Sequence, residues 1–458
     1  MSEVITQKEP IAAIATPIGE AGIAVIRVSG EDCISRVNKI FKGKDLTKQA
    51  SHTVHFGHII KDGRVVDEVL VTLFHTPRSY TGEESVEISC HGGVLVTQAV
   101  LETVLTQHIR MAEPGEFTQR AFLNGKLELS QAEAVADLIH AKSRKAVDSA
   151  QQQLEGALGK HIRNFRQAII DATALVELEL DFSEEDVEFA NKDHLTKLLQ
   201  DLDQQIDRLL ETYEAGRLVK HGVRTVFVGL PNAGKSTLLN TLVGTEGAIV
   251  TEIAGTTRDT IDADWSYEGL MFRLTDTAGI RETEDFIEAE GVRRSEKAIQ
   301  DADLVVFLKD LSIPLEPVEE QRIRELRENS DEKPFIALGT KKDIAIESNG
   351  GTSLFDLTVS ATEGEGINAL KSLMKERALQ NKHYDASNLL VTSSRHRDAL
   401  LKTQESVRSA LDALAAGVSG DFLSIDLRAA LHELGTITGE ITTEDLLDSI
   451  FSRFCIGK

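Results

Sequence analysis

The 458 residues suffice for about three typical domains, and an apolar content of 41% with 27% charged residues is ordinary for a soluble globular protein. Three widely spaced cysteines exclude a disulfide framework, no run approaches the ~18 uncharged apolar residues that span a bilayer, and the first residues lack the segments of a secretory signal, so we expect a cytoplasmic protein without a membrane span. The formal net charge of −24 argues against general, long-range attraction to nucleic acid.

Residues 1–125 are expected to form a small α+β domain, because short β-branched runs alternate with turn clusters. The expected strands cover residues 23–28, 54–60, 65–74 and 86–89, and an amphipathic helix covers 94–104. Within this domain we expect Cys33 and Cys90 to be small buried side chains.

Residues 126–220 and 383–458 show helical periodicity. Ser130, with Glu133 three residues later, has the pattern of a capping box that opens a helix. Further helices are expected over 162–180 and 195–218. In the second block, one apolar face carries Leu400, Leu401, Val407, Leu411 and Leu414, and another carries Leu446, Leu447, Ile450 and Phe451. The two blocks favour one discontinuous helical domain with the intervening unit inserted into it, and two separate helical domains are the alternative.

The densest basic stretch of the chain falls on predicted helix. It is either a local nucleic-acid site or a solvated helix face, and we favour the solvated face. Its members are Lys142, Arg144, Lys145, Lys160, His161, Arg163 and Arg166.

Residues 221–382 alternate apolar strands with helical stretches, which indicates a mostly parallel sheet covered by helices. The expected strands cover residues 225–228, 272–275, 304–308, 335–338 and 357–359. The charged residues 312–334 are expected to hold a surface helix and loops.

Residues 229–236 read GLPNAGKS, a complete phosphate-binding loop between a short apolar run and an amphipathic helix. The glycines let consecutive N–H groups point at phosphate oxygens, Lys235 reaches the β and γ phosphates, and the Ser236 hydroxyl can ligate Mg²⁺. A flexible glycine-rich turn is the alternative. The candidate nucleotide contacts here are Asn232, Ala233, Gly234, Lys235, Ser236 and Thr237.

Downstream motifs decide between an ATPase, a kinase and a GTPase. Asp276, Thr277, Ala278 and Gly279 follow an apolar strand, where the acid can hold magnesium through water and the glycine N–H can meet the γ-phosphate. A Gly/Thr-rich loop, residues 255–259, offers a threonine hydroxyl to the magnesium. Candidate guanine contacts are Thr340, Lys341 and Asp343, with Ser360 and Ala361 after the next strand. An acid at residue 343 accepts from guanine donors that adenine lacks, so GTP is the expected nucleotide.

Two positions depart from the usual GTPase pattern. Thr340 stands where Asn is usual, which removes the two-sided bonding of an amide and predicts weaker guanine affinity. Ile280 stands where Ras-like enzymes have the glutamine that orients the attacking water. Another group must therefore do this work, or hydrolysis is slow. By position alone the candidates are Glu282, Glu284, Asp285, Glu288 and Glu290.

Seven short runs carry a resemblance that covers the whole chain. They are residues 27–30 (RVSG), 91–93 (HGG), 114–117 (PGEF), 121–126 (AFLNGK), 229–240 (GLPNAGKSTLLN), 248–259 (AIVTEIAGTTRD) and 454–458 (FCIGK). The chain resembles the MnmE (TrmE) family of tRNA uridine-modification GTPases. The resemblance implies an N-terminal α+β folate-binding domain, a discontinuous all-α helical domain and an inserted α/β Ras-like P-loop G domain.

The resemblance also implies that the G domains dimerise across bound nucleotide. It further implies that K⁺ takes the catalytic role that an arginine finger has in other systems. It places K⁺ at Asn232, Thr251, Ile253 and Thr256, and Mg²⁺ at Ser236 and Thr257. Glu288 would orient the water, with a solvated surface acid as the alternative. The implied GTP contacts in the intervening loop are Thr251, Glu252, Ile253, Ala254, Gly255, Thr256 and Thr257.

In the N-terminal domain the resemblance implies a site for 5-formyl- or 5,10-methylene-tetrahydrofolate. The implied contacts are Arg27, Glu87, Lys126 and Lys458, and without the resemblance all four would be taken as surface charges. Cys455 is a candidate nucleophile toward the uracil ring; packing, or positioning of Lys458, is the alternative that we favour.

The implied partners are a second copy of the chain through the N-terminal domains, the flavoprotein MnmG in a heterotetramer, and tRNA. The chain has no dinucleotide fingerprint of its own, so redox chemistry would come from that flavoprotein. The rival function is a regulatory or ribosome-assembly GTPase that modifies nothing. A structural G-domain polymer is a third, weaker alternative.

Overall fold

The computed structural model describes residues 9–181, 192–244, 261–276, 296–328, 333–346, 354–380 and 389–458. The chain divides into two compact units. The first consists of Met1–Ala136, Gln153–Arg166 and His432–Lys458, and the second of Asp137–Gln152 and Gln167–Leu431. Within the described ranges, none of the helices combines the length and apolar character needed to cross a membrane.

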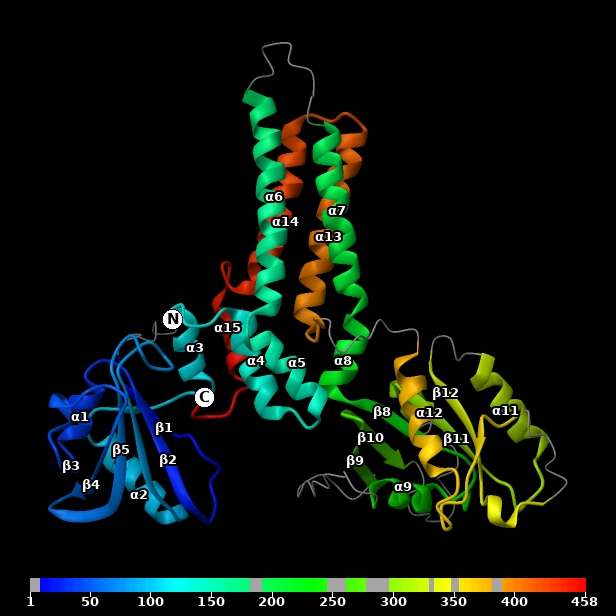
Figure 1. Cartoon of the computed structure of the whole chain (residues 1–458), viewed down its shortest axis with the longest axis horizontal. Coiled ribbons are helices and arrows are strands. Elements are labelled where there is room, and N and C mark those ends of the chain that lie inside the picture. The colour runs from blue at the N-terminus through cyan, green and yellow to red at the C-terminus, as the bar shows by residue number, and fades with distance from the viewer. Residues whose placement is uncertain are drawn as a thin grey trace. The chain divides into compact units, whose positions relative to one another are not determined.

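The first unit is built on a seven-stranded sheet with the order β3-β4-β5-β6-β2-β1-β7 (Figure 1). The pairs are antiparallel except β1 with β7. The strands are β1 (Ile11–Ile14), β2 (Ala21–Ser29), β3 (Phe41–Lys42), β4 (Thr53–Lys61), β5 (Arg64–Phe74), β6 (Ser85–Gly92) and β7 (Arg110–Met111). The sheet contains the four strands expected from the sequence, and the short β1, β3 and β7 were not predicted.

Helices α1 (Cys33–Asn38) and α2 (Val94–Leu105) cover one face of this sheet. Alternate strand residues such as Ile26 and Ile88 are fully buried, as the period-2 pattern requires, and they pack in one core with helix residues such as Val100. The opposite face leaves Val54 and Phe56 exposed. Cys33 and Cys90 lie in the buried core and burial raises the pKa of both thiols, which confirms the prediction that they are buried.

A smaller apolar cluster in the same unit joins helices from both ends of the chain. It packs α3 (Glu116–Leu123) and α4 (Leu129–His140) with α15 (Glu444–Phe451), and it includes the predicted face of Leu447, Ile450 and Phe451. The N-terminal end of the sequence and its last residues are therefore parts of one compact unit.

The predicted capping box at Ser130 is wrong by two residues. Helix α4 already begins at Leu129, and Gln131 Oε1 accepts from the Glu128 backbone N–H at 2.9 Å, the reciprocal bond of a helix start at Glu128. Ser130 is fully buried, and its hydroxyl has no hydrogen-bond partner among the described residues. Sequence spacing identified the correct turn but not the residue that caps it.

The helical part of the second unit brings together the two helical blocks of the sequence. Gln404 on α13 donates to Asp207 on α7 at 3.1 Å, and Arg408 donates to Asp203 at 2.8 Å, so the two helices run side by side (Figure 1). The helices with all or most of their residues in this unit are α5 (Arg144–Leu154), α6 (Ala157–Asp181), α7 (Lys192–Glu211), α8 (Tyr213–His221), α13 (Ser394–Ala415) and α14 (Gly420–Thr438).

Two details of the helical prediction differ from the structure. The helix expected over 195–218 is broken at Thr212 into α7 and α8. Leu401 is 46% exposed, because the buried residues Leu400, Val407 and Leu414 recur every seven positions and Leu401 lies one helical step away from their stripe.

The basic stretch lies on and beside α5 and α6, and Lys142, Arg144, Arg163 and Arg166 pair there with acids.

The α/β part of the second unit is a six-stranded sheet with the order β13-β12-β11-β8-β10-β9. All neighbours are parallel except β9 with β10. Its elements are β8 (Val223–Val228), α9 (Lys235–Val243), β9 (Ile261–Tyr267), β10 (Leu270–Asp276), β11 (Leu304–Asp310), α11 (Pro317–Glu328), β12 (Phe335–Thr340), β13 (Leu357–Thr358) and α12 (Ile367–Leu379).

Helices cover both faces of this sheet. Alternate strand residues contact α9 and α12 on one face, for example Leu308 and Leu338, while Phe307 packs with Ile323 of α11 on the other. The five predicted strands and the predicted surface helix are present. The antiparallel β9 was missed, although the alternation in residues 261–267 before Glu268 and Gly269 is the pattern of a hairpin, with φ of 45° and 79° at its turn.

Candidate functional site

The phosphate loop connects the end of β8 to the start of α9. A Cβ on Gly229 would lie 2.3 Å from the Leu308 carbonyl oxygen, so only glycine lets the loop pass this close to β11. Asn232 and Gly234 have φ of 65° and 86°, and these left-handed residues turn the backbone into the N-terminus of α9. The loop thus has the curled backbone and the helix N-terminus that suit a phosphate group.

Lys235 is 5% exposed and its ammonium lies inside the loop. Its Nζ donates to the carbonyl oxygens of Gly229 at 2.7 Å and Leu230 at 3.0 Å. Ser236 and Thr237 follow in the first turn of α9 and are exposed. The buried ammonium and the backbone N–H groups of the loop together form the set of donors that phosphate oxygens require.

Thr340 ends β12 beside the phosphate loop. Its Oγ1 lies 2.8 Å from the Ala233 carbonyl oxygen and 3.0 Å from the Lys309 carbonyl oxygen, and the residue is 5% exposed. Lys341 follows with φ of 55° and places its Nζ 2.6 Å from Asp310 Oδ2. Burial would raise the pKa of Asp310, but the hydrogen bonds from Lys341 and Ser312 outweigh it and hold the pKa below its usual range.

The remaining predicted guanine contacts gather at the same edge of the sheet. Asp343 lies in a 3₁₀ turn, Lys342–Ile344, with its side chain exposed. The turn is held to the next strand by a hydrogen bond from the Lys342 N–H to the Val359 carbonyl at 3.1 Å. Ser360 is fully buried, and the Ala361 carbonyl accepts from Thr241 of α9 at 3.3 Å. The carboxyl ends of parallel strands thus bring the phosphate loop and the base-reading residues together.

Part of the predicted nucleotide site lies outside the described residues. Asp276 ends β10, and only its backbone is described. The other residues outside the description are Thr251, Glu252, Ile253, Ala254, Gly255, Thr256, Thr257, Thr277, Ala278, Gly279 and the predicted catalytic Glu288.

The first unit holds a second cluster of predicted residues. Arg27 on β2 and Glu87 on β6 are direct cross-strand neighbours, and Nε and Nη2 of the arginine donate to Glu87 Oε1 at 3.1 and 2.9 Å. The Arg27 guanidinium also lies 5.4 Å from the ring centroid of Tyr80 and 5.7 Å from that of Phe117. Two aromatic rings and a carboxylate therefore fix the direction of this cation.

The C-terminal tail, residues 454–458, lies against this pair. Arg27 Nη1 is 3.5 Å from the Gly457 carbonyl oxygen, although 430 positions separate the two residues. Gly457 has φ of 98°, and a Cβ there would lie 2.5 Å from the Ile14 carbonyl oxygen. Burial, and next the positive charge of Arg27, lower the pKa of Lys458 against the opposing charge of Glu87. The tail thus brings the amine of Lys458 within electrostatic reach of Arg27 and Glu87.

The other two predicted residues of this region lie differently. Cys455 is exposed within the tail. Lys126 donates from Nζ to the Pro77 carbonyl oxygen at 3.2 Å and is exposed. Arg27, Glu87 and Lys458 are brought together, whereas the contacts of Lys126 are with the loop between β5 and β6.

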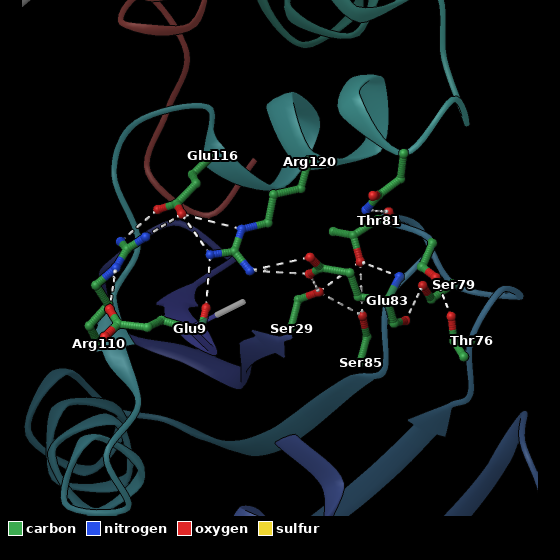
Figure 2. Close-up of polar contacts among 12 residues, drawn as sticks. Glu9, Ser29, Thr76, Ser79, Thr81, Glu83, Ser85, Arg110, Glu116 and Arg120 are labelled. Carbon is green, nitrogen blue, oxygen red and sulfur yellow. Dashed lines mark hydrogen bonds and ion pairs between the residues drawn. The ribbon is translucent and has the colours of Figure 1, made fainter. Parts of the chain in front are cut away.

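A buried ion-pair network in the same unit was not predicted. Figure 2 shows Arg120 between Glu116 on one side and Glu83 on the other, with Ser29 next to the Glu83 carboxylate. Arg120 and Glu116 side chains are 4% and 5% exposed, and Arg110 donates to Glu116 as well. Their spacing of four on a helix was the only available signal, and it is typical of exposed pairs too.

Taken together, the doubly covered parallel sheet, the curled loop with a buried lysine and the acid-bearing turn at the sheet edge define a multidomain P-loop GTPase. Two family models match the chain: "MnmE helical domain" over residues 129–455 and "GTP-binding protein TrmE N-terminus" over residues 10–126. The chain belongs to the MnmE family of tRNA modification GTPases.

Curated relatives agree over the full length. The chain is 46% identical to the tRNA modification GTPase MnmE of Salinibacter ruber, across 99% of this chain and 100% of the relative. It is 44% identical to that of Christiangramia forsetii and 42% identical to that of Bacillus cytotoxicus, each across 98% of this chain and 99% of the relative. One helical-domain model spans residues 129–455, and α7 and α13 from the two helical blocks run side by side, which confirms the discontinuous helical domain.

Proposed function

We propose that the chain hydrolyses GTP within an enzyme complex that modifies carbon-5 of the wobble uridine in tRNAs. The product would be a carboxymethylaminomethyl or aminomethyl group built from a folate one-carbon unit. The observation that carries this proposal is the docking of the C-terminal tail onto the Arg27–Glu87 pair in a chain that also holds a complete phosphate loop. A switch GTPase without modification activity has no evident use for the docked tail.

The residues that would hold GTP and its ions fit this role where they are described. The curled backbone at Gly234, the buried Lys235 and the exposed Ser236 suit phosphates and Mg²⁺. Asn232 is exposed in the loop, and its side-chain oxygen would be a ligand of K⁺. With Thr251, Ile253 and Thr256, it would hold a cation that neutralises charge developing between the phosphates.

Tetrahydrofolate would be held by the first unit. Glu87 would accept from the amino-pyrimidine donors of a pterin, while Arg27, Lys126 and Lys458 would pair with carboxylates of the ligand. The ion pair and the docked tail support this assignment, because they preform a cluster of both charges on the sheet face opposite α1 and α2. Cys455 is exposed in the same tail, so it stays a candidate nucleophile or a positioning residue for Lys458.

The proposed assembly is a homodimer through the N-terminal domains, joined by a flavoprotein that supplies FAD and NADH, acting on tRNA in the cytoplasm. The G domains would associate on binding GTP and K⁺. The proposed boundaries are residues 1–125 for the folate domain, 126–220 and 383–458 for the helical domain, and 221–382 for the G domain.

Binding and hydrolysis measured on one preparation test this proposal against its rival. The full chain should bind 5-formyl-tetrahydrofolate and also hydrolyse GTP. GTP hydrolysis without any folate binding would favour a regulatory or ribosome-assembly GTPase instead.

The catalytic details have their own test. Hydrolysis should be fast in KCl and slow in NaCl, since the proposed cation site must fit K⁺; equal rates would remove the cation from the mechanism. Glu288→Ala should keep GTP binding and lose most turnover. Retained turnover would return Glu288 to the role of a surface acid.

A further inference from the structure

Thr340, at the end of β12, contacts the phosphate loop, strand β11 and the residue that follows β11. Its side chain lies between the Ala233 carbonyl of the phosphate loop and the Lys309 carbonyl of β11, at 2.8 and 3.0 Å. Its own carbonyl accepts from the Leu311 N–H at 3.1 Å. All three contacts are with backbone, and the neighbouring residues Ala233 and Lys309 are 2% and 1% exposed.

The hydroxyl has one proton, and both atoms facing it are acceptors. It therefore donates to the Ala233 or the Lys309 carbonyl and has no second donor for a purine ring. An asparagine amide would carry two N–H donors and could serve the loop and the base at once. In this chain the side chain at residue 340 serves the protein backbone.

We propose that Thr340 is a positioning residue that couples the phosphate loop to the base-reading loop and does not itself read guanine. This inference rests on the proposed GTP hydrolysis, because it assigns a role within the same site. Base recognition then falls to Asp343 and to the backbone at Ser360 and Ala361.

The coupling has a physical basis in the curvature of the phosphate loop. The Ala233 carbonyl is directed to Thr340, and Gly234, the next residue, is the left-handed cap from which α9 begins. If the hydroxyl is removed, the buried carbonyl that accepts its proton loses this donor, and the backbone around residue 340 must shift to satisfy it. On the other side, Lys341 is anchored to Asp310, so a shift at residue 340 displaces both loops.

Binding of GTP and of 7-deaza-GTP, which lacks the N7 acceptor that a side-chain donor at residue 340 would read, separates positioning from base reading. Thr340→Val keeps the shape but removes the donor, and it should weaken both nucleotides by the same factor, about tenfold. Thr340→Ser keeps the donor and should restore affinity close to that of the wild type. Asp343→Asn is the base-reading comparison, and its loss should be larger for GTP than for inosine triphosphate, which lacks the 2-amino donor of guanine.

Thr358→Val, a half-buried threonine on the neighbouring β13, is the matched control and should leave both affinities unchanged. Unequal losses for the two nucleotides in Thr340→Val, or no loss, would overturn the inference. If that variant does not fold, Thr340→Cys, with a weak thiol donor, carries the same comparison. Absence of GTP binding in the wild type would instead refute the proposed function itself.

Discussion

The nucleotide site and the tail site differ in how the chain assembles them. The phosphate loop is eight consecutive residues between one strand and one helix, and its neighbours come from adjacent strand ends. The tail site joins residues of β2 and β6 to the end of the chain, with 430 positions between Arg27 and Gly457. A contiguous motif determines its own geometry, whereas a site made by distant segments depends on the fold of the whole unit.

The two sites should therefore fail independently. Damage to the phosphate loop should abolish hydrolysis without affecting the first unit, and damage to the tail should do the reverse.

Lys235→Ala should have the largest effect. Removing the only ammonium that lies within the phosphate loop among the described residues should slow GTP hydrolysis on the order of a thousandfold, because preorganised donors stabilise developing phosphate charge. Lys297→Ala, an exposed lysine of the same unit, is the control and should keep its turnover. Tetrahydrofolate binding, measured by titration calorimetry, should not change; a parallel loss of folate binding would show that the sites are not independent.

Glu116→Gln should destabilise the first unit by about 3 kcal/mol, because it removes the buried carboxylate that Arg110 and Arg120 share and leaves Glu83 to balance the buried charge of Arg120. Hydrogen exchange of β2 and β6 amides measures this loss of unfolding free energy. Glu113→Gln, at an exposed residue, is the control and should change the unfolding free energy by less than about 0.5 kcal/mol.

The same variant has a defined pH dependence. Burial would raise the pKa of Glu116, but bonds from Arg110, the Glu113 N–H and Arg120 hold it below the usual 4.5. A carboxylate whose pKa is lower in the folded than in the unfolded state stabilises the fold at pH values above its unfolded pKa. This contribution to stability is lost as the pH falls through the folded pKa. The difference between wild type and Glu116→Gln should therefore shrink below about pH 4.5. A constant difference down to strong acid would contradict the assigned pKa.

Gly457→Ala should weaken tetrahydrofolate binding about tenfold and leave GTP hydrolysis unchanged. The alanine must adopt a left-handed φ and its Cβ would meet the Ile14 carbonyl, so the tail should lift from β1. Gly63→Ala is the matched control, since it has a φ of 76° in the same unit but open space around its Cβ. Equal folate binding in both variants would show that the tail does not contribute to folate affinity.

The pH dependence of folate binding should give the smallest effect. The pKa of Lys458 is lowered, so its charged form is lost at a pH below that of an ordinary lysine, and affinity for an anionic ligand should fall as pH rises through that value. Lys458→Arg keeps its charge and should bind equally across alkaline pH. A flat profile in the wild type would remove Lys458 from the contacts with the ligand.

The same contrast explains what the sequence could predict. The parallel sheet, the phosphate loop and the discontinuous helical domain follow from periodicity and contiguous motifs. The cap at Glu128, the hairpin strand β9 and the exposure of Leu401 depend on which neighbour each segment meets, so propensity alone does not decide them.

The tail site shows the limit most clearly. Nothing in the local sequence around Arg27 or Glu87 distinguishes this cross-strand pair from a surface ion pair, and only the family resemblance marked them. Likewise, Thr340 could be recognised as a departure from the usual motif, but its two backbone acceptors come from segments 107 and 31 positions away.

Nucleoside analysis of tRNA tests the central claim most directly. In a strain that lacks this gene, the carbon-5 modification of wobble uridine should disappear, and the wild-type gene should restore it. Neither Lys235→Ala nor a chain without residues 455–458 should restore it, since the account requires both sites. Modified wobble uridine that persists in the deletion strain would contradict the account.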